Sequence, residues 1–252
     1  MTPRESSHWY DKDGNPCHEQ PNKSKGGLRP TTLKDARRLN LLPSVTTILG
    51  CMAKPGLDLW KQRNAIHAAL TTPRLQGEGE DAFCDRILSE DVHSISDAAK
   101  ERGTAIHGAI EAVLSGVSRD KIDPELMPFV GPVLEACEPF GIAVNAEKSI
   151  VGKGYAGKLD ALFSDGDNYT LVDFKTASTI PAKQYDEHLL QLSAYAATIG
   201  FPVRTANIYI DSNTPGVIKV VGNEDSEWRD AFENGFMPLF NFWQWKNNYK
   251  PL

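Results

Sequence analysis

Two aspartates and a lysine stand in the segment "GKLDALFSDGDNYTLVDFKT", residues 157–176, where strand interiors normally carry apolar side chains. If Gly166–Asp167 is the two-residue loop of a hairpin, with glycine first as a type II′ turn prefers, then Asp160 faces Asp173. Side chains alternate along a strand, so Lys175 shares the face of Asp173. The hairpin is therefore expected to bury one face and to display both carboxylates and the ammonium group on the other.

Opposed carboxylates repel each other, and a divalent cation between them would turn that repulsion into a binding site. Oxygen ligands of this kind suit Mg²⁺ or Mn²⁺. An adjacent lysine could orient or deprotonate a water molecule, or stabilise the charge that develops on a phosphate. Such a short pattern also occurs on solvated faces without any chemical role, and on these residues alone that interpretation stays open.

Two helical segments carry further polar groups one turn apart. In "QLSAY", Gln191 and Tyr195 lie on one helical face, and His188 falls on the same stripe. Upstream, "RGTAIHGAIE" places His107 and Glu111 four residues apart at the border of an apolar face. Each group alone is more typical of the edge of a core, but beside a metal site Gln191 and Tyr195 could hold a phosphate or a bound water.

Hydrophobic periodicity indicates the elements that must position these residues. Helices are expected at 44–52 with Ser44 as N-cap, at 57–70, from about 82, at 96–116 with Ser96 as N-cap, and from about 124. The pattern alternates from 143 to 176, which predicts three strands. A helix ending at Gly200, strands within 203–211 and 216–222, and a closing helix at 226–248 follow. This order predicts an α/β or α+β fold with one central sheet.

The composition favours a packed protein, since 40% of the 252 residues are hydrophobic and 24% are charged. Residues 1–42 are predicted to form an extended basic arm, and residues 43–252 a single domain with a helical part (43–142) and a core sheet with helices (143–252). Residues 1–40 contain eight Lys/Arg and five Asp/Glu, whereas the remainder contains 19 and 28. An acidic body with a basic arm is compatible with a metal-dependent enzyme that acts on a polyanion.

The sequence contains no apolar run long enough to span a membrane and no signal peptide at its start, so we expect a cytoplasmic protein without a membrane partner. The four cysteines are widely separated, which excludes the zinc and redox signatures that need a C-x-x-C pair. They are expected to be free thiols: Cys17, Cys51, Cys84 and Cys137.

Taken together, Asp160, "DFK", "QLSAY" and "GTAIH" resemble the motifs of the PD-(D/E)XK nuclease superfamily. The G-x-x-x-H and Q-x-x-x-Y elements resemble its RecB-type branch, which includes phage exonucleases and the mitochondrial genome maintenance exonuclease. "LPSVTTILG" also resembles a segment near the N-terminus of such exonucleases, so the match spans about residues 43–200. The resemblance implies a restriction-endonuclease-like α/β fold, with a central mixed sheet flanked by helices and an N-terminal helical region.

The resemblance also implies residue roles. One or two Mg²⁺ or Mn²⁺ ions would be held by His107, Asp160, Asp173 and the backbone carbonyl of Phe174. Lys175 would be the catalytic lysine, and Gln191 and Tyr195 would position DNA and the attacking water. The second acid is aspartate rather than the commoner glutamate, which could shift the metal preference. Neighbours that could support these groups are Glu147, His188 and Glu111.

The implied activity is that of a DNA exonuclease in phage-type recombination, repair or degradation, which would place a phage-encoded protein in the host cytoplasm. A structure-specific or flap endonuclease, or a non-catalytic DNA-binding module, remains an alternative. Single-stranded DNA or duplex ends would be contacted by basic residues, best by Arg102 and also by Arg37, Arg38, Lys61 and Arg63. Trp60 could stack on bases but is more simply a core residue of its helix, and Tyr10 is a second candidate for stacking.

Two motifs missing from the sequence restrict the partners and cofactors that we expect. No phosphate-loop motif occurs, so any helicase or recombinase would be a separate partner. A single-strand-binding protein is a further possible partner. Some RecB-type nucleases carry an iron–sulfur cluster with three cysteines after the Q-x-x-x-Y helix. This chain has no cysteine beyond Cys137, so no such cluster is expected.

Overall fold

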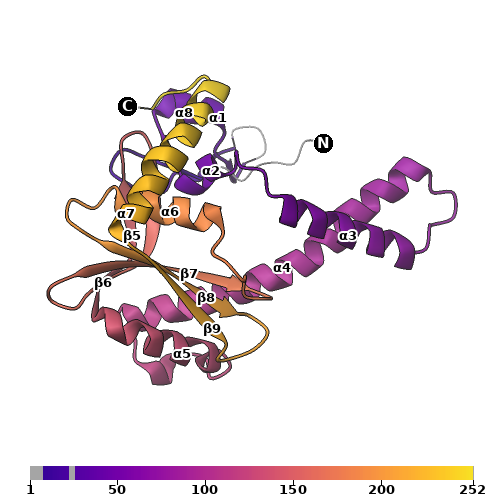
Figure 1. The fold of residues 1–252 in the computed structure, drawn as a ribbon. Helices are drawn as coiled ribbons and strands as arrows, with labels where there is room; N and C mark the ends of the chain where they lie inside the picture. Colours follow the sequence, from indigo (N-terminus) through magenta and orange to yellow (C-terminus); the bar gives the residue numbers. More distant parts are fainter. Residues whose placement is uncertain (1–7, 23–25, 252) are drawn as a thin grey trace.

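The computed structural model describes residues 8–22 and 26–251, with the backbone alone for residues 89–100. A five-stranded sheet lies between two groups of helices, and a helical hairpin projects from this body (Figure 1). Its strands are β5 (Ile142–Val151), β6 (Ala156–Ser164), β7 (Tyr169–Ala177), β8 (Arg204–Asp211) and β9 (Ile218–Asn223). The expectation of a mixed sheet flanked by helices is confirmed.

The strand order is β5-β6-β7-β8-β9, with β7 and β8 parallel and the other pairs antiparallel. A parallel pair needs a crossover connection, and α6 (Asp186–Ala196) supplies it between β7 and β8. This helix ends before Gly200, and the helix expected from about 124 begins three residues later, as α5 (Met127–Cys137).

The β6–β7 hairpin has the predicted register. Its paired residues run from Ser164 with Tyr169 to Ala161 with Val172, which leaves Gly166–Asp167 as the loop. Gly166 has a φ of 103°, the left-handed backbone that a glycine adopts most easily at this place in a turn. The ladder ends one position before Asp160 and Asp173 would pair.

Both faces of the sheet are covered by helices, so the expectation that the hairpin displays its charged face is wrong. On one face Leu171 packs with Leu192 of α6 in a single core cluster. On the other face Val172 packs with Ile106 of α4 (Glu80–Leu114). Because the crossover places α6 over the face with the acids, Asp173 is only 1% exposed.

The N-terminal part differs from the expected extended arm. Within residues 8–22 and 26–43 it contains β1 (Trp9–Tyr10) paired with β4 (Leu42–Pro43), β2 (Glu19–Pro21) paired with β3 (Leu28–Pro30), and α1 (Leu33–Leu39). Thr32 and Asp35 form a capping box at the start of α1. Trp9 is 1% exposed within the main core cluster, so burial of its large apolar surface fixes this segment to the body.

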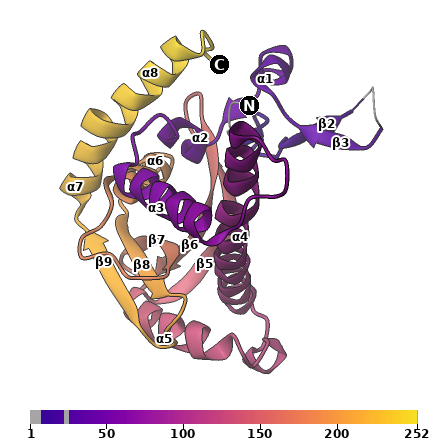
Figure 2. The same cartoon turned by 90° about the vertical axis from the view of Figure 1, so that its right-hand side faces the viewer.

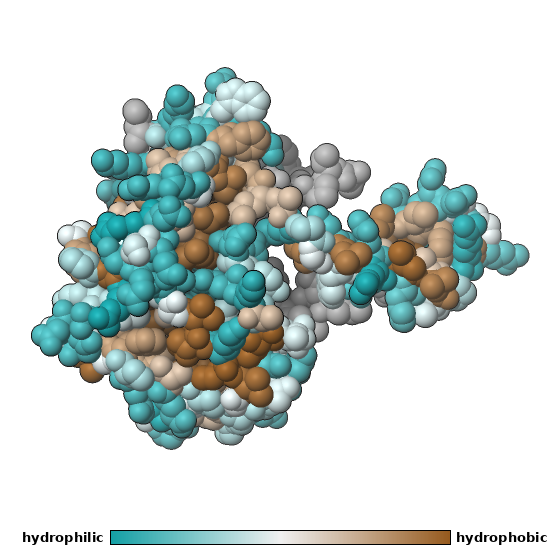
Figure 3. Space-filling view, viewed as in Figure 1, coloured by the Kyte–Doolittle hydropathy of each residue, from teal (hydrophilic) through white to brown (hydrophobic). Residues whose placement is uncertain are grey.

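Ser44 caps α2 (Val45–Leu49) as predicted, since its Oγ accepts the Thr47 N–H at 2.9 Å. The next two helices, α3 (Pro55–Thr71) and α4, form the projecting hairpin seen in Figures 1 and 2. The two helices expected between 82 and 116 are one continuous helix, so Ser96 lies inside α4 and is not an N-cap. Apolar side chains lie exposed along this hairpin (Figure 3), among them Leu70 at 81%.

The closing helix is confirmed with one irregularity. It consists of α7 (Asp225–Asp230), a π-helical turn (Ala231–Phe236) and α8 (Met237–Lys246). Pro238 has no N–H to donate to the carbonyl four residues earlier, which accounts for the wider turn before it. No helix within the described ranges combines the length and apolar character that crossing a membrane requires. All four cysteines are free thiols, as expected.

Candidate active site

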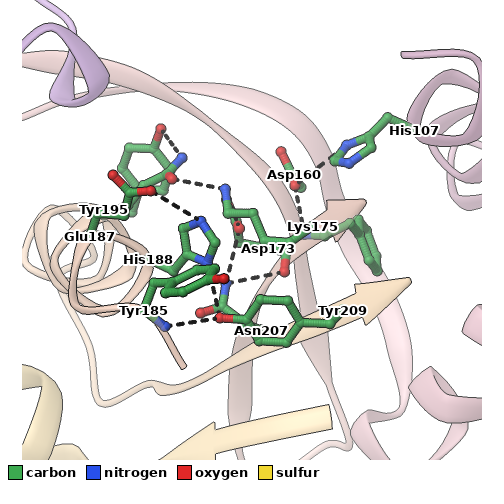
Figure 4. Close-up of polar contacts among 12 residues, drawn as sticks. His107, Asp160, Asp173, Lys175, Tyr185, Glu187, His188, Tyr195, Asn207 and Tyr209 are labelled. Atoms are coloured by element: carbon green, nitrogen blue, oxygen red, sulfur yellow. Dashed lines mark hydrogen bonds and ion pairs between the residues drawn. The ribbon is translucent and has the colours of Figure 1, made fainter. Parts of the chain in front are cut away.

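Asp173 is held by two donors on neighbouring side chains (Figure 4). The ammonium group of Lys175 lies 2.7 Å from Asp173 Oδ2, and Asn207 Nδ2 donates to the same oxygen at 3.0 Å. The parallel register places Asn207 of β8 directly beside Asp173 of β7. Both residues are almost completely buried, so these hydrogen bonds replace the solvation that the carboxylate has lost.

Lys175 is linked in turn to the predicted glutamine and tyrosine of α6. Its Nζ donates to Gln191 Oε1 at 2.8 Å, and Gln191 Nε2 donates to the Tyr195 hydroxyl at 3.0 Å. A Cβ atom at Gly157 would lie 2.6 Å from Tyr195 Cε1, so only glycine admits the ring at this point of β6. The structure therefore brings Asp173, Lys175, Gln191 and Tyr195 together as a chain of polar contacts.

Asp160 lies where both of its neighbouring ladders are interrupted. In the hairpin register Phe174 would pair with Leu159, but its N–H donates instead to Asp160 Oδ2 at 2.8 Å. On the other side, the β5–β6 pairing passes over Glu147, which has a φ of 51° although it is not glycine. Glu147 forms an ion pair with Lys158. These irregularities turn the Asp160 carboxylate toward β7.

His107 approaches Asp160 from α4, with Nδ1 4.0 Å from Asp160 Oδ2. A Cβ atom at Gly103, one turn earlier, would lie 2.6 Å from Thr176 Oγ1, so this glycine lets the helix approach the end of β7 closely. Burial lowers the pKa of His107, against the opposing effect of the Asp173 charge. The imidazole is therefore mostly neutral at pH 7, the form that binds metal ions.

The charges of the site are unbalanced. Burial, followed by the charge of Asp173, raises the pKa of Asp160 to about 7. Burial lowers the pKa of Lys175, but the charges of Asp173 and Asp160 outweigh it, so its pKa lies above the ordinary value. With both acids ionised, one ammonium group faces two carboxylates, and an added cation would compensate the remaining charge.

The donor chemistry fits a hard divalent cation. The site contains two carboxylates and a neutral imidazole, and the contacts described above engage Oδ2 of each aspartate. Oxygen-rich sets of this kind suit Mg²⁺ or Mn²⁺. Among the side chains that the structure describes, however, no three His, Cys, Asp or Glu residues are grouped closely enough to hold a metal ion.

Asn207 is the residue that sequence reasoning missed. It stands between apolar residues in "TANIYI", and a buried amide in a central strand indicates a specific partner. Gln184 Nε2 donates to its Oδ1 at 2.7 Å, which fixes the orientation of the amide. His188 is engaged by other partners than Asp160 and Asp173: its Nδ1 lies 2.9 Å from the Tyr209 hydroxyl, and its Nε2 lies 3.8 Å from Glu187 Oε1. Burial and the charge of Lys175 lower the pKa of His188 to about 3.

The basic residues expected to contact DNA are not gathered in one place. Arg102 donates to the Ser212 carbonyl at 3.1 Å beyond the end of β8, and Arg37 donates to the Asn247 carbonyl near the C-terminus. Arg38 is 64% exposed on α1. Lys61 and Arg63 are exposed on α3, and Glu111 is half-buried one turn beyond His107.

The positions of Tyr10 and Trp60, the two candidates for stacking on bases, differ from those expected from the sequence. Tyr10 is buried with its ring edge against His18, so the expectation that it stacks on bases is wrong. Trp60 is not a core residue, because 40% of its surface is exposed. It lines an open groove of about 570 Å³ together with Tyr185, Lys54 and Glu187, the last two joined by an ion pair of 2.5 Å.

Comparisons with known proteins add little. No protein-family model matches the chain, and neither does any curated protein. Among solved structures, one described as the crystal structure of SSO0001 is similar over 72% of this chain and 86% of that chain. Its sequence identity is 15% and the TM-score is 0.32, a level of similarity that carries no argument about fold or function.

Proposed function

We propose that this chain has a restriction-endonuclease-like fold and is a divalent-metal-dependent deoxyribonuclease, an exonuclease that hydrolyses phosphodiester bonds from DNA ends. The observation that supports it best is the position of Lys175, held between the Asp173 carboxylate and the Gln191 amide while Asp160 faces the same strand. A chain of polar contacts thus joins Asp173, Lys175, Gln191 and Tyr195, and the Phe174 N–H holds Asp160 beside it. His107 completes the set from α4.

Mg²⁺ or Mn²⁺ would be held by Asp160 and Asp173, with His107 and the Phe174 carbonyl as further ligands. When bound, such an ion polarises a phosphoryl oxygen and lowers the pKa of water. Asn207 and Lys175 orient Asp173, and the Phe174 N–H orients Asp160. Preorganised carboxylates of this kind need no rearrangement when substrate binds.

Lys175 acts as a cation rather than as a base. Its raised pKa keeps it protonated at pH 7, so it stabilises negative charge on the phosphate and donates a hydrogen bond to the attacking water. Gln191 accepts from Lys175 and donates to Tyr195, which fixes the direction in which the ammonium group points. These residues position the water and the scissile phosphate relative to each other.

The substrate is DNA, either single-stranded or at duplex ends, in recombination, repair or degradation in the cytoplasm. Trp60 and Tyr185 offer exposed rings in the groove beside α6, where an unpaired base could stack. A helicase, a recombinase or a single-strand-binding protein would act as a separate partner.

The test compares end-labelled linear DNA with closed circular DNA in the presence of Mg²⁺ and of EDTA. We expect Mg²⁺-dependent loss of linear DNA while the circle persists. Equal cutting of the circle would favour a structure-specific endonuclease, and DNA binding without any cleavage would favour a non-catalytic module.

Substitutions at Lys175 and Asp173 test whether DNA cleavage depends on the candidate active site. Lys175→Ala and Asp173→Asn should each abolish cleavage while the fold, followed by circular dichroism, persists. Lys121→Ala, at an exposed lysine outside the site, serves as the matched control and should cleave like the wild type. Full activity in either site variant would refute the assignment.

A further inference from the structure

Two exposed aromatic residues lie on the outer side of α8. Phe242 and Trp245 are 47% and 76% exposed, with ring centroids 5.8 Å apart. Phe240 and Trp243, on the inner side of the same helix, are buried in the core. Core packing therefore explains the inner pair and not the outer one. Exposed aromatic rings one helical turn apart are typical of a surface that contacts a ligand.

The chain turns back after α8 and brings polar groups to Trp245. Asn248 has a φ of 44°, and the Tyr249 N–H donates to the Gln244 carbonyl at 3.1 Å, as in a Schellman motif. This turn fixes the positions of the residues that follow it. A hollow of about 520 Å³ results, lined by Asn241, Gln244, Trp245, Asn248, Tyr249 and Lys250.

The same turn joins α1 to the C-terminal segment. The Tyr249 hydroxyl lies 2.8 Å from the Leu41 carbonyl and 3.1 Å from the Ala36 carbonyl. Arg37 donates to the Asn247 carbonyl. Two segments more than 200 residues apart in the chain thus form one surface, at the top of Figure 1.

This surface is strongly basic in an acidic protein. Residues 33–41 and 241–251 contain five Lys/Arg and one Asp, whereas the whole chain carries a net charge of −6. The single acid, Asp35, is buried and bound by Arg29 at 2.6 Å. Lys34 stands three and four residues before Arg37 and Arg38, so the three share one face of α1. We define the α1–α8 surface by Lys34, Arg37, Arg38, Trp245, Lys246 and Lys250.

We propose that the α1–α8 surface binds a single strand of nucleic acid. Trp245 stacks on an unpaired base, and the basic side chains around it neutralise the phosphates on either side. The amides of Asn241, Gln244 and Asn248 offer donors and acceptors to the edge of that base. Duplex bases are already stacked on each other, so the surface selects a single strand. It shares no residue with the candidate active site and rests on the proposed function only for the choice of DNA over RNA.

Binding is tested without cleavage, in EDTA, by the fluorescence anisotropy of a labelled oligothymidylate of about 20 nucleotides. Stacking contributes about 1–3 kcal/mol per base, so Trp245→Ala should weaken binding by roughly five- to 150-fold. Phe201→Ala is the matched control, because Phe201 is also exposed (43%) but lies beside Asp167, Glu224 and Asp225. It should bind like the wild type.

The basic residues are tested through salt dependence. In a plot of log affinity against log salt concentration, each lost phosphate contact should reduce the slope by about 0.7. Lys246→Ala combined with Lys250→Ala should therefore flatten the plot, while Lys121→Ala should not. Thermal midpoints close to that of the wild type would show that the variants are folded.

The outcomes separate this inference from the proposed nuclease activity. If Trp245→Ala binds as tightly as the wild type, or if Phe201→Ala weakens binding equally, the α1–α8 surface is not the site. If Trp245→Ala weakens binding but the wild type cleaves nothing, the surface stands and the nuclease proposal fails. If the wild type cleaves and Trp245→Ala has no effect on binding, only the surface is rejected.

Discussion

The backbone N–H of Phe174 donates to the carboxylate of Asp160 at 2.8 Å, in the place of the next ladder bond of the β6–β7 hairpin. The hairpin therefore opens where the two acids meet. This contact holds Asp160 beside Asp173 in a buried setting, and that setting raises the pKa of Asp160 to about 7. The proximity that would serve metal binding thus costs stability as long as no cation is bound.

Asp160→Asn should therefore stabilise the metal-free protein at pH 8. The folded pKa of about 7 lies above an unfolded value of about 3.9, so the stability of the wild type falls as pH rises between them. Asparagine cannot ionise, and its Oδ1 can still accept the Phe174 N–H. Melting curves in EDTA should show a higher midpoint for the variant at pH 8, by roughly 2–4 °C for each kcal/mol added to the free energy of unfolding. Below pH 4 the two midpoints should not differ.

In Mg²⁺ the wild type should melt above Asp160→Asn, because the wild type gains stability by binding the ion and the variant does not. The variant should also lose DNA cleavage. If Asp160→Asn melted below the wild type in EDTA at pH 8, the charge of Asp160 would not be what destabilises the metal-free protein.

Asn207→Ala should reduce kcat by about 10–100-fold, the range usual for residues that orient metal ligands. The substitution leaves Asp173 with Lys175 as its partner and removes the acceptor of Gln184, so we also expect weaker Mg²⁺ binding by calorimetry. Asn213→Ala is the control, because Asn213 is exposed beyond the end of β8. Wild-type Mg²⁺ affinity in Asn207→Ala would contradict the orienting role.

Two glycines of α4 should respond in opposite ways to alanine. At Gly108 a Cβ atom meets nothing within 4 Å, so Gly108→Ala should stabilise the protein by about 0.5–1 kcal/mol. At Gly103 it meets Thr176, so Gly103→Ala should push α4, and His107 with it, away from β7. Cleavage should fall in Gly103→Ala, and the double variant with Thr176→Ala should recover it. Equal activity of the two alanine variants would argue against close packing at Gly103.

Asp35 should stabilise the protein at neutral pH and lose this effect in acid. Its hydrogen bonds to Arg29 and Thr32 hold the pKa of Asp35 well below its ordinary value. The stabilisation is complete above the unfolded pKa of about 3.9 and disappears as pH falls through the folded pKa. Asp35→Asn should lower the free energy of unfolding by about 1 kcal/mol at pH 7 and by less at pH 3. Asp225→Asn, in an exposed pair with Arg229, should change it little at either pH.

The sequence predicted the hairpin register and the two pairs Asp173–Lys175 and Gln191–Tyr195 because each depends on local spacing: alternation in a strand or one turn in a helix. The meeting of the two pairs depends on the placement of α6, and only the family resemblance implied it. Asn207 was missed because it reaches Asp173 through the pairing of β7 with β8, which local spacing does not determine. The burial of Asp173 was missed for a related reason, since it depends on where the crossover places α6. The polar neighbours of Trp9 favour an exposed arm, whereas burial of its own large apolar side chain fixes the segment to the core.

The continuous helix α4 also sets a length scale. From Glu80 to His107 it rises through 27 residues, about 40 Å at 1.5 Å per residue. A molecule that touched the tip of the projecting hairpin and the imidazole at once would have to span that distance, about 12 nucleotides at the B-form spacing of 3.4 Å. The length of α4 thus fixes the distance between the tip of the hairpin and His107. If DNA follows it, cleavage rates measured on a series of oligonucleotides should change stepwise near that length.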